Sequence, residues 1–451
     1  MIVSTFEDDL LQLKDFADRL NKFIDVERDY VEGSLVIALS SKYGSGKSSF
    51  LQMWKTSFED PEDKSNTPFV ISLNAWESDY YGDPLYAIIS ELVNAVQDKG
   101  ESAKELISAA KDFGWFATAI GGQVTKKFTG VDPVAAGGLS EKKKAERNEM
   151  VQLAPDTFSI YQDRKNAMST LKNAIRDFVE GAESRVLFLV DELDRCRPDY
   201  AISYLETIKH IFDVKGAVFV LAADRHHLEN SARTAFGSKL DFEEYYRKFV
   251  HREVTLPNIS EIGYKNLVSK YVQYYLEREG SRNCFMKLDG YRVEDMSKFI
   301  GALKLTPRQI QEVFRILGHI FDASEEEKGN LLWCLAVGSI VMASLKVGES
   351  RIFHLLGSQS IDPKEAYDFL ERLLGGDNID YWFTLFLTGG GLRLEEGESS
   401  IDVMIKLGML EGEASNHSGE LVQWHQGWGL SYSSRFAEIH EKIEQLSKWS
   451  K

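Results

Sequence analysis

Residues 41–49, with the sequence SKYGSGKSS, have the types and spacing needed to hold a polyphosphate. The run follows the apolar residues 35–39 and precedes a helix-like stretch at residues 50–54. A strand that turns through glycines into a helix directs backbone N–H groups and the positive helix end at one point, where phosphate can bind. The pattern therefore predicts a phosphate-binding loop, although Ser41 stands where such loops usually have their first glycine.

Each position of this loop has an expected part in the chemistry. Gly44 and Gly46 supply backbone freedom, Lys47 reaches the β- and γ-phosphate oxygens of ATP, and Ser48 places a hydroxyl on Mg²⁺. The residues expected to contact the nucleotide are Tyr43, Gly44, Ser45, Gly46, Lys47, Ser48 and Ser49.

A second chemical cluster follows the apolar run at residues 186–190, which has the length and composition of a central parallel strand. Asp191 and Glu192 come at its carboxyl end, where open α/β sheets bind ligands. We expect Asp191 to hold Mg²⁺ through water and Glu192 to orient or deprotonate the attacking water. The alternative for two acids after a strand is a helix N-cap. Asp194 and Arg195 extend this cluster, and their alternative role is a surface ion pair.

Two further positions are candidates for sensing the γ-phosphate. Asp224 follows the apolar residues 217–222, and its alternative role is to form a turn. Farther along, Thr306, Pro307 and Gln309 predict a capped helix start with a capping box. Arg308 then lies in the first helical turn, where the helix dipole disfavours a cation. A nearby phosphate would reverse that cost, which would make Arg308 a sensor of the γ-phosphate. The alternative is that Arg308 forms a salt bridge with an acidic neighbour.

Taken together, these residues resemble the KAP family of P-loop NTPases. The matching segments, in the family's order, are SKYGSGKSSFL at 41–51, NAWE at 74–77, LVDELDRCRP at 189–198, VFVLAADR at 218–225, YRK at 246–248 ahead of Pro257, and LTPR at 305–308. The chain departs from the family at Ser41, at Tyr43 in place of tryptophan, and at Glu192 in place of a second aspartate. The change at Glu192 is mild, because a glutamate and an aspartate carboxylate can both act on water.

This resemblance implies ATP binding and hydrolysis, with Mg²⁺, on an additional-strand P-loop fold. The expected fold class is α/β, a parallel sheet flanked by helices, with a helical lid and a mostly helical C-terminal region. The expected domains are a P-loop NTPase core at 1–258, a helical lid subdomain at 259–323 and a C-terminal domain at 324–451. The family is also linked to membranes and to bacterial defence against phage.

The elements that must position the loop can be outlined from periodicity. Apolar residues within 6–24 share one helical face, which predicts an amphipathic helix before the first strand. Further helices are expected at residues 84–96 and 200–212, and in the C-terminal region near 329–345, 363–374 and 434–449. Trp76 is expected in the core.

Residues 113–155 are expected to form an insertion that leaves the core and returns. Its Phe113, Trp115, Phe116 and Phe128 are too apolar for a plain linker, but its uncharged run is too short for the roughly 20 apolar residues that span a bilayer. A partner-binding surface would explain both properties. The alternative is a helix pair packed on the protein's own core.

Composition limits the classes of function. The net charge of −17 argues against a surface that broadly coats nucleic acid. The three cysteines, Cys196, Cys284 and Cys334, lack metal-ligand spacing, so we expect a reducing cytoplasm. No secretory signal and no membrane span are predicted. His226 and His227 are adjacent rather than four apart, and no other metal-ligand pattern is apparent.

Three functions remain open from the sequence. The favoured one is an ATP-driven switch that forms homo-oligomers and acts through protein partners, with Arg195, Arg225 or Arg247 serving a neighbouring subunit as an arginine finger. The second is a nucleic-acid-dependent motor or sensor, for which the local support is the basic run at residues 142–144. The third is a scaffold that binds nucleotide without turnover.

Overall fold

The computed structural model describes residues 4–59, 67–97, 100–120, 157–182, 184–276, 290–322, 332–376, 378–417, 419–429 and 434–448. Its contacts form two compact units. The first comprises Met1–Asp9, Leu13–Tyr43 and Lys47–Pro257, and the second comprises Leu10–Gln12, Gly44–Gly46 and Asn258–Lys451. The described residues of each unit enclose a hydrophobic core.

A five-stranded sheet with the order β2-β3-β4-β1-β5 forms the centre of the first unit. Its strands are β1 (Leu35–Ser40), β2 (Phe69–Asn74), β3 (Val186–Asp191), β4 (Ala217–Ala223) and β5 (Arg252–Thr255). All pairings are parallel. The strand β4 lies between β1 and β3, and it is the additional strand that was expected. The α/β fold class is therefore confirmed.

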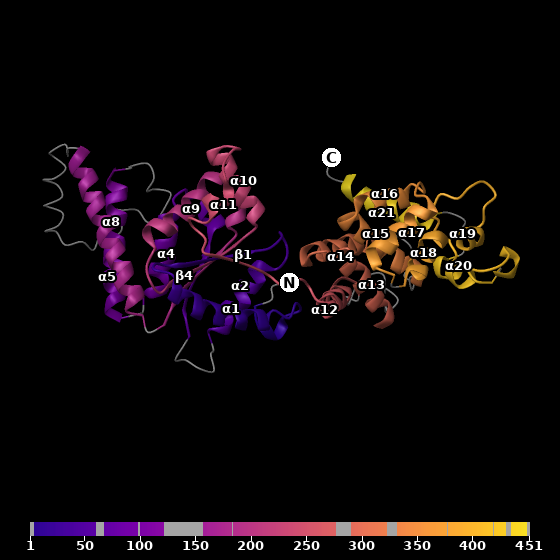
Figure 1. Ribbon diagram of the computed structural model, residues 1–451, viewed down its shortest axis with the longest axis horizontal. Coiled ribbons are helices and arrows are strands. Elements are labelled where there is room, and N and C mark those ends of the chain that lie inside the picture. Colours follow the sequence, from indigo (N-terminus) through magenta and orange to yellow (C-terminus); the bar gives the residue numbers. More distant parts are fainter. Residues whose placement is uncertain are drawn as a thin grey trace. The chain divides into compact units, whose positions relative to one another are not determined.

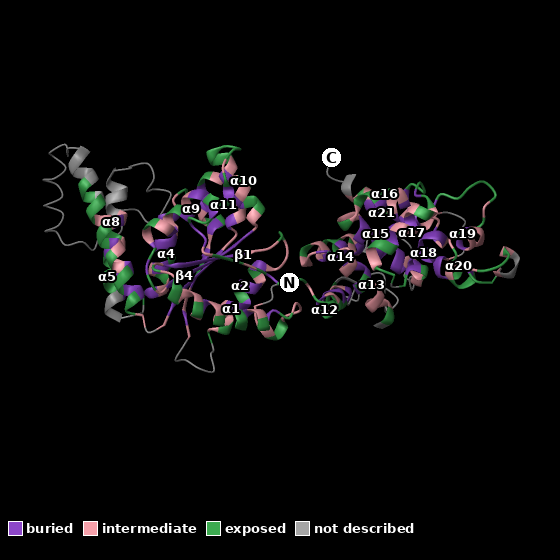
Figure 2. Ribbon diagram, viewed as in Figure 1, coloured by how far each residue is buried: buried purple, intermediate pink, exposed green. Residues whose placement is uncertain are grey.

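The central strands are apolar throughout because both faces of the sheet are covered. Val186, Phe188 and Val190 belong to the core that the strands share with helices of the first unit. The intervening Leu187 and Leu189 are equally buried. In Figure 2 the strands at the middle of the first unit are accordingly coloured as buried.

Helices lie on both sides of this sheet, as Figure 1 shows. They are α1 (Lys14–Glu27), α2 (Lys47–Ser57), α3 (Ala75–Asp79), α4 (Pro84–Val96), α5 (Gly100–Ile120), α8 (Thr157–Glu180), α9 (Pro198–Ile211), α10 (Arg225–Phe236) and α11 (Phe242–Tyr246). The helix expected over residues 6–24 is two elements, a short turn at Phe6–Asp8 and then α1. The rings of Phe16 and Phe50 lie 5.2 Å apart and join α1 to α2.

The start of the expected insertion belongs to the core. α5 continues to Ile120 and lies beside α8 (Figure 1). Phe113 is 1% exposed, and its ring lies 5.7 Å from that of Tyr86 on α4. The expectation that Phe113 faces a partner is therefore wrong for this residue, because α5 packs it against α4. Outside the described part of the chain lie residues 121–156, with Phe128 and the basic run, the side chains of Trp115 and Phe116, and Cys284.

The second unit is mostly helical, as expected. Its helices are α12 (Glu261–Tyr271), α13 (Gly290–Ala302), α14 (Pro307–Asp322), α15 (Trp333–Gly348), α16 (Ser350–Gly357), α17 (Pro363–Leu374), α18 (Ile379–Thr388), α19 (Ser400–Lys406), α20 (Val422–Trp428) and α21 (Arg435–Lys448). One continuous core runs from Leu267 on α12 to Ile443 on α21. A separate lid subdomain at 259–323 stays a prediction.

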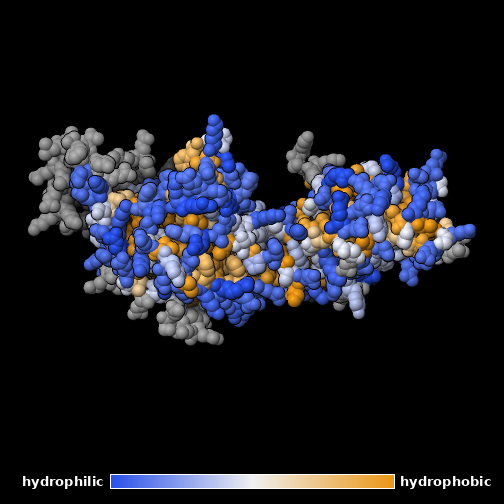
Figure 3. Space-filling model, viewed as in Figure 1, coloured by the Kyte–Doolittle hydropathy of each residue, from blue (hydrophilic) through white to orange (hydrophobic). Residues whose placement is uncertain are grey.

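None of the described helices combines the length and the apolar character needed to cross a bilayer. On the face drawn in Figure 3, hydrophilic residues predominate among the coloured residues.

The tight core of the second unit generates a stability prediction at Gly389, the residue that ends α18. A Cβ atom there would lie 2.4 Å from a ring carbon of Phe436 and 2.7 Å from one of Trp428. Because both rings are buried, we expect Gly389→Ala to cost about 1 to 3 kcal/mol and to lower the thermal midpoint by about 2 to 10 °C. Gly419→Ala, which meets no atom within 4 Å, is the control, and equal midpoints for both variants would contradict the prediction.

Candidate functional site

The loop after β1 has the backbone shape of a phosphate cradle. Gly44 has φ +77° and Gly46 has φ +103°, conformations that side chains disfavour. Lys47 begins α2 and is 8% exposed, and its ammonium donates to the carbonyl oxygen of Ser41 at 2.6 Å. The buried hydroxyl oxygen of Ser45 has no hydrogen-bond partner among the described residues. A phosphate oxygen would give Ser45 the partner that its burial requires.

Strand register brings the acidic residues to the same edge of the sheet. β2 and β3 pair so that Asn74 lies opposite Asp191, each at the last position of its strand. β1 and β4 likewise end together, with Ser40 opposite Ala223. Because all the strands are parallel, their carboxyl ends form one edge, which is where ligands bind in such sheets.

Asp191 and Ser48 form the pair that could hold a magnesium ion. The Asp191 carboxylate accepts hydrogen bonds from the Ser48 hydroxyl and, at 2.8 Å, from the backbone N–H of Glu192. Burial raises the pKa of Asp191, and these two hydrogen bonds oppose that rise. A hydroxyl and a carboxylate are the hard oxygen ligands that Mg²⁺ prefers, so the residues present fit the ion.

Glu192 is held in an unusual conformation. Its φ of +61° lies in the left-handed region, which is uncommon for residues other than glycine and costs on the order of 1 kcal/mol. One carboxylate oxygen accepts from the Asn74 amide at 3.3 Å, and the other lies 2.7 Å from the Arg195 guanidinium. The expected catalytic carboxylate is thus restrained on both of its oxygens.

Asn74 does two structural tasks with one side chain. Its amide oxygen accepts from the backbone N–H groups of Trp76 and Glu77 and so caps α3, while its amide nitrogen donates to Glu192. Trp76 is 50% exposed, so the expectation that it packs in the core is wrong. Trp76 instead lies half-exposed on α3, beside the Arg195 guanidinium.

An aromatic pair accompanies Arg195. Its guanidinium carbon lies 5.5 Å from the centre of the Tyr43 ring and 5.3 Å from that of Trp76. These cation–π contacts add to the ion pair with Glu192. Arg195 therefore belongs to the site within its own chain rather than to a plain surface ion pair.

Asp194, which the sequence placed beside the acidic pair, makes contacts that sequence reasoning did not identify. Its side chain is 7% exposed, and one carboxylate oxygen lies 3.7 Å from the Lys47 ammonium. The same oxygen accepts the backbone N–H of Asp224 at 2.8 Å. The sequence position of Asp194, three residues after Asp191, indicates this role, because it places Asp194 on the short turn Leu193–Arg195 that follows β3.

Asp224 lies between β4 and α10, as the N-cap residue of that helix. Its carboxylate accepts the backbone N–H of His226 at 3.0 Å and caps α10. Its own backbone N–H is bound by Asp194. A sensor role for Asp224 stays a prediction.

The arginines proposed to act across a subunit boundary differ in their surroundings. Arg225 pairs with Glu243 and, at 2.5 Å, with Glu253, and it lies over the Tyr246 ring at 5.2 Å. Arg247, at the end of α11, is exposed. Internal pairing therefore leaves Arg225 poorly suited to serve a neighbour.

Arg308 lies in the second unit, in the first turn of α14. The predicted capping box is confirmed, since Thr306 accepts from the Gln309 N–H at 3.4 Å and Gln309 accepts from the Thr306 N–H at 2.9 Å. The backbone N–H of Arg308 donates at 3.3 Å to the carbonyl oxygen of Gly44, which the contacts group with this unit. A phosphate-sensing role for its side chain stays a prediction.

A cavity of about 790 Å³ within the first unit adjoins the Ser48 and Asp191 pair. Its lining includes Ser72 and Leu189, which lie opposite each other on β2 and β3. Residues of α2 and α4 also line it. The site therefore has open space next to the two residues that fit a magnesium ion.

Residues 13–322 match the model of a family described as "KAP family P-loop domain". Among solved structures, the chain is similar to the Aeropyrum pernix ORC2 protein, described as ADPNP–ADP complexes. That match has 13% sequence identity and a TM-score of 0.37, and it covers 97% of this chain and 95% of that one. No curated protein matches the chain.

Burial of Asp191 predicts a stability gain when its charge is removed. An unfolded aspartate loses its proton near pH 4, whereas the folded group, with its raised pKa, loses it at a higher pH. The folded protein is therefore destabilised as pH rises between these two values and remains so above them. We expect Asp191→Asn to raise the thermal midpoint by a few degrees at neutral pH, and this advantage to vanish below about pH 4.

The matched control for this experiment is Asp199→Asn. Asp199 is exposed in the first turn of α9, where its charge favours the helix, so its removal should lower the midpoint slightly. Thermal unfolding across a pH series, without nucleotide or Mg²⁺, measures both variants. A midpoint that falls in Asp191→Asn at neutral pH would show that the buried charge does not destabilise the fold.

Proposed function

The chain belongs to the KAP family of P-loop NTPases, and from this premise we propose that it is a Mg²⁺-dependent ATPase that works as a molecular switch. The proposal rests on one observation. Lys47, Ser48, Asp191 and Glu192 lie together where β1 and β3 end. Each of these has the chemistry that one part of phosphoryl transfer requires.

In this proposal the loop binds the triphosphate and the acidic residues serve the attacking water. Backbone N–H groups of the loop, with Tyr43, Ser45 and Ser49, contact the nucleotide, and Lys47 neutralises phosphate charge. Ser48 and Asp191 would hold Mg²⁺, which when bound offsets the charge on the β- and γ-phosphates. Glu192 orients the water and accepts its proton.

The contacts of Glu192 support a way to regulate turnover. While Asn74 and Arg195 bind both carboxylate oxygens, the carboxylate is restrained from turning toward water. Asn74 also caps α3, so a displacement of that helix would change the restraint on Glu192. The half-exposed Trp76 on α3 offers a surface through which a partner could act. Partner proteins and a role in bacterial defence against phage stay predictions that rest on the family resemblance.

Hydrolysis is tested with two variants of the full chain. Glu192→Gln should keep ATP bound yet slow turnover by about 10²-fold or more, because an amide cannot accept the proton of water. Lys47→Ala should weaken binding itself, because it removes the cation from the loop. Phosphate release with Mg²⁺ and binding of a fluorescent ATP analogue measure the two steps.

Glu229→Gln, on the surface of α10, is the matched control and should hydrolyse ATP at the normal rate. Unchanged turnover in Glu192→Gln would remove this residue as the catalytic base. Binding without turnover in the natural chain would favour a scaffold, and turnover only with DNA or RNA would favour the nucleic-acid-dependent alternative.

The second consequence of the proposal is that copies of the chain assemble into a homo-oligomer. An arginine supplied by a neighbouring subunit accelerates hydrolysis at a P-loop site. The exposed Arg247 is the best placed of the three arginines, since Arg195 and Arg225 pair within the chain. We expect Arg247→Ala to lower turnover of the assembled protein by about 10²-fold or more while leaving nucleotide binding intact. Mixing it with Lys47→Ala should restore activity, because each subunit supplies what the other lacks.

Arg233→Ala on α10 serves as the control and should behave like the natural chain. Light scattering with a slowly hydrolysed ATP analogue gives the oligomeric state. A monomer with and without the analogue at micromolar concentration, or a mixture that stays inactive, would count against action across subunits.

A further inference from the structure

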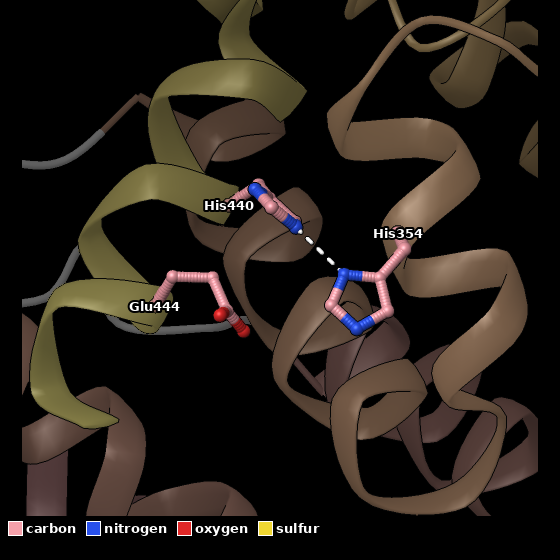
Figure 4. Close-up of side chains that lie close together, drawn as sticks. All are labelled: His354, His440 and Glu444. Carbon is pink, nitrogen blue, oxygen red and sulfur yellow. Dashed lines mark hydrogen bonds between the residues drawn. The ribbon is translucent and has the colours of Figure 1, made fainter. Parts of the chain in front are cut away.

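Three potential metal ligands meet in the second unit, where α16 contacts α21. His354 comes from α16, and His440 and Glu444 come from α21. One nitrogen of each histidine and one carboxylate oxygen all lie within 4.8 Å of one another. Figure 4 shows the two imidazole rings pointing toward each other, with the Glu444 carboxylate beside His440.

The spacing of the two histidine nitrogens matches that of a shared ion. His354 Nδ1 and His440 Nε2 are 3.1 Å apart. In a tetrahedral site with Zn–N bonds of about 2.0 to 2.1 Å, two ligand nitrogens lie about 3.3 to 3.4 Å apart. A shift of a few tenths of an ångström would therefore place both nitrogens at bonding distance from one ion. His440 and Glu444, four residues apart, share one face of α21.

We propose that His354, His440 and Glu444 bind one divalent ion of the zinc class, which joins α21 to α16. Two imidazoles and one carboxylate are a common ligand set for zinc, with water completing the tetrahedron. None of the three residues belongs to the proposed nucleotide site. The exposure of His354 gives an ion in solution access to the cluster.

Packing around His440 fixes the direction of its ring. The rings of His440 and Phe353 lie 4.6 Å apart. Gly357, one turn beyond His354 on α16, leaves the space that the His440 ring occupies, since a Cβ there would lie 2.2 Å from its Cγ. A ring held in this way needs little rearrangement to ligate an ion.

Lys346 on α15 positions the third ligand. Its ammonium binds one carboxylate oxygen of Glu444 and lies 4.9 Å from the centre of the Phe353 ring. Carboxylate ligands in metal sites are commonly hydrogen-bonded to a second residue in this manner. The alternative is a metal-free arrangement, a hydrogen bond between two histidines beside an ion pair.

Zinc binding by the full chain tests the proposal. Protein freed of metal with a chelator, without nucleotide, is titrated with Zn²⁺ by calorimetry and with Co²⁺, whose visible absorption reports tetrahedral coordination. We expect one ion per chain. His354→Ala should weaken binding at least tenfold. Because His354 is exposed, its removal should not prevent folding.

Two further variants keep the test decisive. Glu444→Gln preserves the shape of the third ligand and should also weaken binding at least tenfold, whereas His227→Ala, an exposed histidine on α10, should bind like the natural chain. Zinc should raise the thermal midpoint of the natural chain and of His227→Ala, but not that of His354→Ala. Equal zinc binding in all the proteins would mean adventitious surface binding, and absence of binding in the natural chain would favour the metal-free pair. Either result would overturn the proposal.

Discussion

The candidate nucleotide site depends on the register between β2 and β3, which sets Asn74 opposite Asp191 at the ends of their strands. A slip of one residue would turn every side chain of β2 to the other face of the sheet. The alternation within β2, where the buried Ile71 and Leu73 flank the exposed Ser72, opposes such a slip. As a result the Asn74 amide can reach Glu192, and the Asp191 carboxylate can accept from Ser48. Core packing thus determines the geometry of the polar edge.

The polar edge itself works against stability. Asp191 carries a buried carboxylate whose pKa is raised, and Glu192 adopts a left-handed conformation that costs free energy. Asp194 is nearly buried as well, and it offsets its own burial by binding Lys47 and the backbone of Asp224. Strain and buried charge gathered at one edge are typical of sites preorganised for a ligand rather than for maximal stability. Burial of the apolar faces of the sheet stabilises the fold and offsets the cost of this arrangement.

The second unit obeys a different constraint, because one hydrophobic core joins helices from α12 to α21. Close packing there leaves no room for a Cβ at Gly357 or Gly389, so α21 can approach its neighbours closely. The same approach brings His440 to within hydrogen-bond distance of His354. A cluster with the chemistry of a metal site therefore arises as a consequence of core packing.

By itself, the sequence determined the features that depend on neighbours along the chain. Uninterrupted apolar runs predicted β1, β3 and β4, and local capping residues predicted the start of α14 at Pro307. Lys47, Ser48, Asp191 and Glu192 were identifiable because their chemistry is tied to a loop and a strand end. Only the tertiary structure decided which distant residues meet. The Asn74 bond to Glu192 spans 118 positions and the contact of His354 with His440 spans 86, separations that strand order and helix packing bridge and that no local pattern encodes.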